Sequence, residues 1–205
     1  MTKKLLFTFL LVALFSSKIN AQAEAIEYGF KIGTNRANVV GDETDTYYMR
    51  GSVHMGVLVD IPVIEYMLSV QPELLYSFQG HRFLDEDSVY DDHTLKLDYI
   101  VLPVMVKYYF TPGFNVEAGP QIGMLTSALL EAKTTENGVT ERTKEKVNDI
   151  ISDIDYGVNV GLGYQFEIGL FLQARYYVGL AGIVDVEEGV DQRNTVLQFS
   201  AGYKF

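Results

Sequence analysis

The chain contains no cysteine. Disulfide bonds, thiolate metal sites and cysteine nucleophiles are therefore excluded. Basic residues are also few, since 16 Lys and Arg stand against 27 Asp and Glu and give a formal net charge of −11. Along the sequence they form no cluster of the kind that neutralises phosphates in nucleic-acid binding. We therefore expect no nucleic-acid partner.

Long apolar runs are missing after the first fifteen residues. A transmembrane helix needs about 20 consecutive apolar residues, so the sequence excludes a helical membrane protein.

The first residues have the pattern of a secretory signal peptide. Lys3 and Lys4 form a short positive region, residues 5–15 are almost entirely apolar, and small residues follow up to Ala21 and Ala23. The apolar run is about half the ~20 residues that a membrane-spanning anchor requires. We expect residues 1–23 to be removed by cleavage after Ala21 or Ala23, leaving a strongly acidic mature chain of residues 24–205.

The mature chain alternates between apolar and polar residues instead of following a helical period. In the first segment Tyr28, Phe30 and Ile32 share one face, and Lys31 lies on the other. The same alternation recurs in eight segments, at residues 28–33, 53–61, 68–79, 99–110, 114–124, 154–166, 170–179 and 197–205. Soluble sandwiches also alternate, but their strands are usually near five or six residues long, whereas most of these segments are long enough to cross a membrane when tilted.

The connections between these segments alternate in length. Short ones occur at residues 62–65, 111–113 and 167–169, and long polar ones at residues 38–50, 80–94, 129–152 and 182–194. Outer-membrane barrels have short periplasmic turns and long outer loops. The sequence therefore predicts an all-β fold, an eight-stranded antiparallel up-and-down transmembrane β-barrel in the outer membrane, with both termini in the periplasm. For residues 131–151 a short capping helix and a loop remain open alternatives.

Several motifs carry a resemblance to a known family. They are QPELLYS at 71–77, YIVLP at 99–103, KYYF at 107–110, EAGP at 117–120 and GLGY at 161–164. Together they resemble the PorT-like outer-membrane β-barrel domain family, often described as porin-family proteins. Val101 departs from the carboxylate that the resemblance implies at its position. The alternating apolar residues that end at Phe205 look like the terminal signal read by the barrel-assembly machinery, which we expect as a partner.

An eight-stranded barrel encloses a lumen narrow enough to be filled by side chains, which argues against an open diffusion pore. The alternation places ten polar side chains in this lumen: Lys31, His54, Asp60, Gln71, Glu73, Lys107, Glu117, Gln121, Gln173 and Arg175. Buried charges must be paired. We therefore expect Glu73 and Glu117 to share Arg175 or Lys107 in a polar network that plugs the lumen, with a gate or a narrow ion path as the alternative.

Three prolines fall inside predicted strands, at Pro72, Pro103 and Pro120. Proline cannot donate to a β-ladder, so a local interruption or a bulge is expected at each.

The sequence indicates no enzyme, cofactor or metal. The residues that most resemble a catalytic set are His81, Ser88, Asp91 and His93, which lie in one loop. Such residues occur together by chance in any polar loop. The acidic outer connections fit a solvated surface, or a Ca²⁺ or Mg²⁺ site. We expect a structural or surface-interaction barrel in contact with outer-membrane lipid and lipopolysaccharide, with a transport or secretion-accessory barrel as the alternative.

Overall fold

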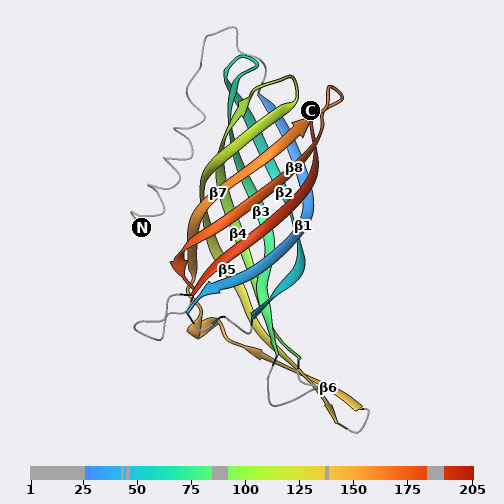
Figure 1. Ribbon diagram of the computed structural model, residues 1–205, viewed down its shortest axis with the longest axis vertical. Helices are drawn as coiled ribbons and strands as arrows, with labels where there is room; N and C mark the ends of the chain where they lie inside the picture. The colour runs from blue at the N-terminus through green and yellow to red at the C-terminus, as the bar shows by residue number, and fades with distance from the viewer. Residues whose placement is uncertain (1–25, 43, 45–46, 85–91, 137–138, 184–191) are drawn as a thin grey trace, which may run out of the picture.

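The alternating segments form a closed antiparallel barrel in the computed structural model (Figure 1). The structure describes residues 26–42, 44, 47–84, 92–136, 139–183 and 192–205, so the predicted signal peptide lies outside the described residues. The strands are β1 (Glu27–Gly41), β2 (Tyr47–Ile64), β3 (Leu68–Leu84), β4 (Asp92–Tyr109), β5 (Phe114–Glu136), β6 (Val139–Lys146), β7 (Ile154–Gln165), β8 (Leu170–Gly182) and β9 (Gln192–Lys204). A 3₁₀ turn, η1 (Asn148–Ile150), precedes β7.

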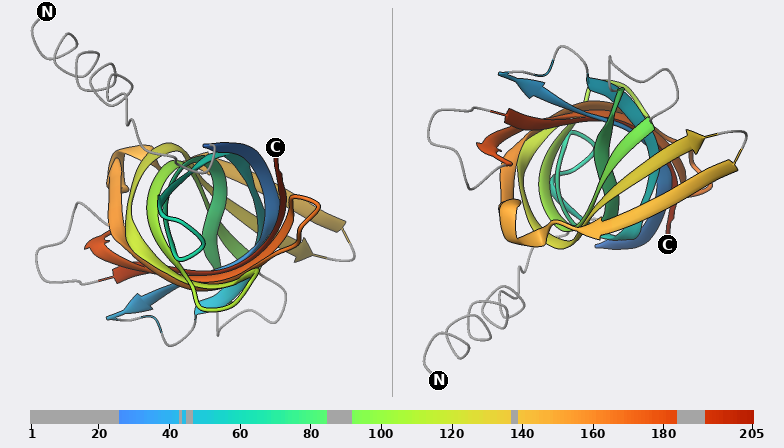
Figure 2. Two further views of the ribbon diagram at one scale, coloured as in Figure 1. Left: turned by 90° about the horizontal axis from the view of Figure 1, so that it is seen from above. Right: turned by 90° about the horizontal axis from the view of Figure 1, so that it is seen from below.

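Eight of these strands form the ring seen along the barrel axis in Figure 2. The first strand, β1, pairs with the last, β9, and β4 pairs with β5, so each of the eight has a partner on both edges. Strand β6 lies outside the ring and pairs with β5 alone. Closure satisfies the backbone groups that an open sheet would leave unpaired in lipid. The eight-stranded barrel is confirmed.

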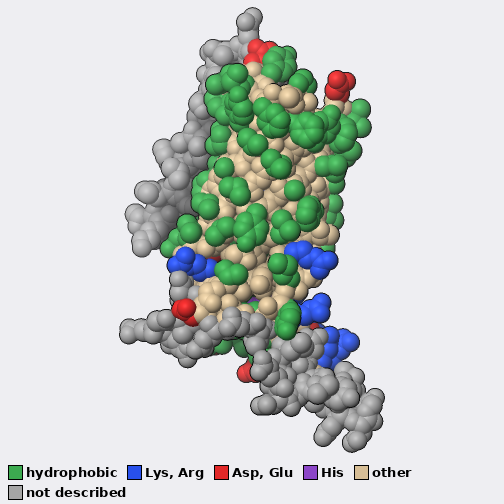
Figure 3. Space-filling model, viewed as in Figure 1, with side chains coloured by type: hydrophobic (Ala, Val, Ile, Leu, Met, Phe, Trp, Pro, Cys, Tyr) green, Lys and Arg blue, Asp and Glu red, His purple; other side chains and the backbone are tan. Residues whose placement is uncertain are grey.

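The two faces of the strands are as the alternation predicts. The apolar side chains Tyr28, Phe30 and Ile32 of β1 are about half exposed and point outward, and apolar side chains are spread over the face of the barrel that Figure 3 shows. All ten polar residues assigned to the lumen are buried. Among the described residues no helix is long and apolar enough to span a membrane.

The two ends of the barrel differ. The turns between β2 and β3, β4 and β5, and β7 and β8 are short and lie at the end where the chain finishes, at the top of Figure 1. Two of them use glycines with positive φ, Gly113 and Gly169, both at 86°, a conformation that glycine adopts without strain. We call this the short-turn end and the opposite one the long-loop end.

The expectations for residues 131–151 were wrong. Strand β5 continues to Glu136 and turns back as β6, so a hairpin projects beyond the ring (Figure 1). The helical spacing of Val147, Ile150 and Ile151 produces a single 3₁₀ turn at Asn148–Ile150. Threonines in both strands of the hairpin favour extended backbone.

Of the two alternatives predicted at the prolines, a local interruption and a bulge, the structure has the interruption. Pro72 pairs with Val104, and Leu75 pairs with Val101 in the same register, so only the two positions between them lack a paired partner. Pro103 and Pro120 likewise leave the register unchanged. The sheet accommodates proline here by a short gap in pairing. A register shift occurs instead between Asp98 and Tyr99 of β4, opposite an extra residue in β5.

That shift changes which residues of β5 face the lumen. Leu125 and Ala128 are both buried in the same apolar cluster although they are three residues apart. Beyond Thr126, the outward positions of β5 are therefore odd-numbered.

Candidate functional site

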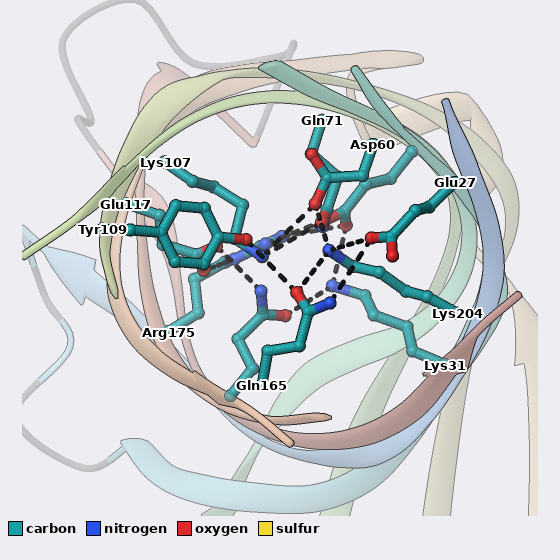
Figure 4. Close-up of polar contacts among 12 residues, drawn as sticks. Glu27, Lys31, Asp60, Gln71, Lys107, Tyr109, Glu117, Gln165, Arg175 and Lys204 are labelled. Atoms are coloured by element: carbon teal, nitrogen blue, oxygen red, sulfur yellow. Dashed lines mark hydrogen bonds and ion pairs between the residues drawn. The ribbon is translucent and has the colours of Figure 1, made fainter. Parts of the chain in front are cut away.

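The centre of the lumen is occupied by one arginine that bridges two glutamates from different strands. Arg175 of β8 donates from Nη1 and Nη2 to the carboxylate of Glu73 on β3, at 3.0 and 2.9 Å. Its Nε donates to Oε1 of Glu117 on β5 at 2.9 Å. Figure 4 shows Arg175 and Glu117 reaching across the lumen. A planar guanidinium with a fork of donors suits this double contact.

Lys31 supplies a second cation beside the two glutamates that Arg175 bridges. Its Nζ lies 2.7 Å from Oε2 of Glu73 and donates to Oε1 of Gln173 at 2.9 Å. Gln173 in turn donates to Oε2 of Glu117 at 2.8 Å. Two cations thus face two carboxylates, all fully buried, which is the arrangement in which buried charges are tolerated. We call Lys31, Glu73, Glu117, Gln173 and Arg175 the central network.

Lys107 does not contact either glutamate of the central network. It donates to Oε1 of Gln71 at 3.1 Å and lies 3.9 Å from Oδ2 of Asp60. The structure therefore joins Glu73 and Glu117 through Arg175 and leaves Lys107 in a second group nearer the short-turn end.

That second group contains residues absent from the set predicted for the lumen network. Lys204 pairs with Asp60, lies 3.4 Å from Oε2 of Glu27 and donates to Oε1 of Gln165 at 2.8 Å. These residues meet near the axis in Figure 4. The alternation before Phe205 already places Lys204 on the inward face, and that signal could have identified it.

A vestibule opens from this second group at the short-turn end. It has a volume of about 1240 Å³, and its polar lining includes Glu27, Asp60 and Gln165. Its rim is apolar and aromatic, with Tyr66 and Ile168 among the exposed side chains.

The lumen changes character toward the long-loop end. An apolar cluster occupies part of it there, made of Leu75, Leu97, Tyr99, Val101, Leu125, Ala128 and Ile151. At the same end Asn194 hydrogen-bonds to the buried side chains of Gln79 and Asp155. Ile151 enters from the segment between η1 and β7, so part of the connection folds into the barrel. Val101 is buried in this cluster, where a carboxylate would have to be paired to be tolerated.

Comparison with known proteins identifies the family to which this barrel belongs. The sequence profile of the family described as outer membrane protein β-barrel domain matches residues 20–185. The chain belongs to that outer-membrane β-barrel family. The barrel therefore resides in the outer membrane, which its strands cross and where its apolar wall contacts lipid.

Solved structures share the fold of this outer-membrane barrel. The attachment invasion locus protein Ail of Yersinia pestis is 16% identical, with a TM-score of 0.50, over 89% of this chain and 100% of that one. Neisserial surface protein A is 15% identical, with a TM-score of 0.51, over the same shares. No curated protein matches the sequence.

Each of the three histidines of the barrel has a hydrogen-bonding or stacking neighbour. His54 is in the lumen, as predicted, and lies between Oδ1 of Asn35 at 2.7 Å and Oγ of Ser200 at 2.8 Å. His81 stacks on Tyr47 and His93 on Phe83. Ser88 and Asp91 lie outside the described residues, which contain no group of three His, Cys, Asp or Glu side chains able to hold a metal.

One buried carboxylate of the barrel has no cation beside it. Asp155 is buried at the start of β7, and its Oδ2 lies 3.5 Å from Nδ2 of Asn194. Every Lys and Arg after residue 25 is in the described part of the chain, and within that part none forms an ion pair with Asp155. Burying an uncompensated charge is unfavourable.

Replacing Asp155 with asparagine is expected to stabilise the barrel by on the order of 1 kcal/mol, since it removes the charge and keeps the shape. Asp60→Asn is the matched control and should do the opposite, because it breaks the pair with Lys204. Urea titration of the refolded protein in detergent measures both changes. Equal destabilisation by the two substitutions would contradict this account of Asp155.

Proposed function

We propose that this protein is a structural and surface-interaction barrel of the outer membrane whose lumen is plugged and does not conduct. The observation that carries the proposal is the pair of layers inside the barrel. The central network crosses the lumen through Arg175, and the apolar cluster with Ile151 occupies part of it toward the long-loop end. An ion would have to displace buried, mutually bonded charges and then pass the side chains of the apolar cluster and the buried polar residues beside it.

The plug is tested by planar-bilayer recording. The native barrel is expected to remain silent, and Arg175→Ala is expected to remain silent as well, because the apolar cluster is unaffected, while the barrel becomes less heat-stable. Lys144→Ala is the matched control, since it removes an exposed cation on β6 outside the ring. Reproducible single-channel steps in Arg175→Ala and not in Lys144→Ala would support the gate or ion path and would contradict the structural plug.

The alternative function, a transport or secretion-accessory barrel, is favoured by the vestibule at the short-turn end. Its volume and its apolar rim with a polar floor suit a periplasmic segment of another envelope protein. The resemblance to the PorT-like group points in the same direction. A photo-crosslinking amino acid placed at Tyr66 or Ile168, which are 78% and 71% exposed, tests this in intact cells. A discrete crosslinked protein would support the accessory role, and lipid adducts alone would count against it.

The non-enzymatic interpretation belongs to the same proposal. It is supported by the neighbours of the three imidazoles, which occupy His54 with hydrogen bonds and His81 and His93 with aromatic stacking.

Export and assembly complete the proposal. Residues 1–23 are removed as a signal peptide, and the mass of the purified mature protein tests the cleavage site. The barrel-assembly machinery then recognises the chain end. This is supported by the outward positions of Phe199, Tyr203 and Phe205, the last of which is 73% exposed. The long-loop end faces the cell exterior, as the asymmetry of turns and loops favours, and lipopolysaccharide surrounds it there.

A further inference from the structure

The basic residues of the barrel fall into two separate groups. Of the thirteen Lys and Arg after residue 25, four are buried in the lumen: Lys31, Lys107, Arg175 and Lys204. The other nine lie near the long-loop ends of their strands or on β6: Arg36, Arg50, Arg82, Lys96, Lys133, Arg142, Lys144, Lys146 and Arg193. At the short-turn end the exposed charges of the described turns are Glu65 and Glu167. In Figure 3 the blue side chains lie at one end of the apolar wall.

The strand register gathers six of these cations on one surface. Lys96 of β4 lies beside Leu129 of β5, which lies beside Lys146 of β6. Two residues further along β5, Glu131 lies beside Lys144 of β6. Residues that pair across strands, and residues two apart along a strand, share a face. The face so formed contains Arg82, Lys96, Lys133, Arg142, Lys144 and Lys146. We call it the basic face.

The basic face points away from the lumen. Lys96 has the same parity as Leu102, which is on the outward face of β4. The register shift at Tyr99 makes the odd positions of β5 outward at this level, so Glu131 and Lys133 join the same face. Arg142, Lys144 and Lys146 are exposed.

The cations on this face outnumber the acidic side chains described on it. Those are Glu131, which pairs with Lys96, and Asp98, which lies two residues from Lys96 on the same face of β4. Arg142, Lys144 and Lys146 are exposed on one face of β6. Like charges this close repel one another, so the arrangement would be favoured by an anion held between them.

The position of the basic face relative to the apolar wall indicates which anion. Lys96 lies four residues beyond Ile100, about 13 Å along the strand at ~3.3 Å per residue. The cations thus begin just past the lipid-facing side chains, at the level of the lipid head groups. Lys and Arg both bind phosphate strongly, and Arg does so with two parallel hydrogen bonds.

A soluble polyanion fits this position less well than a lipid. It would approach from the long-loop end, where the connection at 85–91 carries four acidic residues in its sequence and no basic one. A lipid reaches the basic face from the side of the barrel, through the membrane itself.

We propose that the basic face binds the phosphate groups of a phosphorylated glycolipid of the outer leaflet. The proposal rests on the proposed function, because it requires the long-loop end to be at the cell exterior. It gives the lipopolysaccharide contact a site on the β4–β5–β6 surface, including the hairpin outside the ring.

The test uses the refolded mature barrel in vesicles of phosphatidylcholine alone, with bisphosphorylated lipid A, or with dephosphorylated lipid A. Enrichment of each lipid around the protein is read by energy transfer to a fluorescent lipid A analogue. The native barrel is expected to enrich the bisphosphorylated form alone. The variant Lys96→Gln/Lys144→Gln/Lys146→Gln should reduce its apparent affinity about fivefold for each lysine removed, since a basic residue near a charged lipid surface contributes about that factor.

Two controls separate charge from folding. Lys96→Arg/Lys144→Arg/Lys146→Arg keeps the positive charge and should bind as the native protein does. Glu65→Gln/Glu167→Gln changes exposed charge at the short-turn end and should have no effect. Heat-modified migration on gels shows that each variant still forms the barrel.

Equal enrichment of phosphorylated and dephosphorylated lipid A would overturn the proposal, and so would a glutamine variant that binds like the native protein. Displacement by a sulfated glycan without any lipid preference would assign the face to a soluble polyanion instead. If the native barrel does not conduct, shows heat-modified migration and has no lipid preference, only the lipid-binding inference is refuted. If the native barrel conducts ions, the plugged-lumen proposal is refuted whatever the lipid result.

Discussion

Replacing Arg175 with alanine is expected to lower the free energy of unfolding by about 3–5 kcal/mol. The guanidinium is the shared partner of Glu73 and Glu117 and is itself buried. Its removal leaves two carboxylates with only Lys31 as a cation within the layer. The penalty therefore comes mainly from the unpaired buried charge. Urea titration in detergent micelles, followed by heat-modified migration on gels, measures it.

The charge origin of that loss can be separated from the loss of packing. Arg175→Met with Glu73→Gln and Glu117→Gln removes cation and carboxylates together, and should recover much of the stability, because replacing a buried ionic set by neutral groups of similar volume is often close to neutral. Arg175→Lys should be intermediate, since an ammonium cannot reproduce the fork of hydrogen bonds. If Arg175→Ala unfolds at the same urea concentration as Lys144→Ala, the central network does not stabilise the barrel.

Replacing Gly56 with alanine is expected to destabilise the barrel by about 1–3 kcal/mol or more. A Cβ built at Gly56 would lie 2.0 Å from the carbonyl oxygen of Leu74 and 2.7 Å from Cα of Leu75. Both are backbone atoms of the neighbouring strand β3, so relief requires the β2–β3 pairing to open. The same titration measures the change.

Gly182 supplies the matched control for Gly56. It is also in a barrel strand, but a Cβ there would meet nothing within 4 Å. Gly182→Ala should therefore alter the free energy of unfolding by no more than about 0.5 kcal/mol, as most surface substitutions do. Similar losses for the two alanine variants would show that close approach of β2 and β3 is not what Gly56 provides.

The faces of the strands could be predicted from the sequence because the side-chain period of a strand is a local property. Lys31, Glu73 and Arg175 were assigned to the lumen from their neighbours alone, and all are buried. The local interruption expected at Pro72 and Pro103 is present as a short gap in pairing, and the alternative of a bulge is excluded there because the register is kept. The hairpin of β5 and β6 was missed, since its charged sequence lacks the apolar alternation that marked the ring strands.

The pairing of charges inside the lumen could not be predicted in the same way. Lys107 and Lys31 were both assigned to the inward face, yet Lys31 reaches Glu73 and Lys107 reaches Gln71 and Asp60. Which cation meets which carboxylate depends on the heights at which distant strands present their side chains, and therefore on the strand register around the closed ring.

By itself, the sequence determined that this protein is an eight-stranded outer-membrane barrel with an apolar outer wall and a polar interior, since the alternation and the length of each segment can be read from the sequence. Only the tertiary structure decided that Arg175 joins Glu73 to Glu117, that an apolar cluster occupies part of the lumen toward the long loops, and that cations scattered along the chain gather on the basic face. The physical reason is that a strand fixes the side to which a residue points, whereas its partners are fixed by register and closure between strands that are remote in sequence.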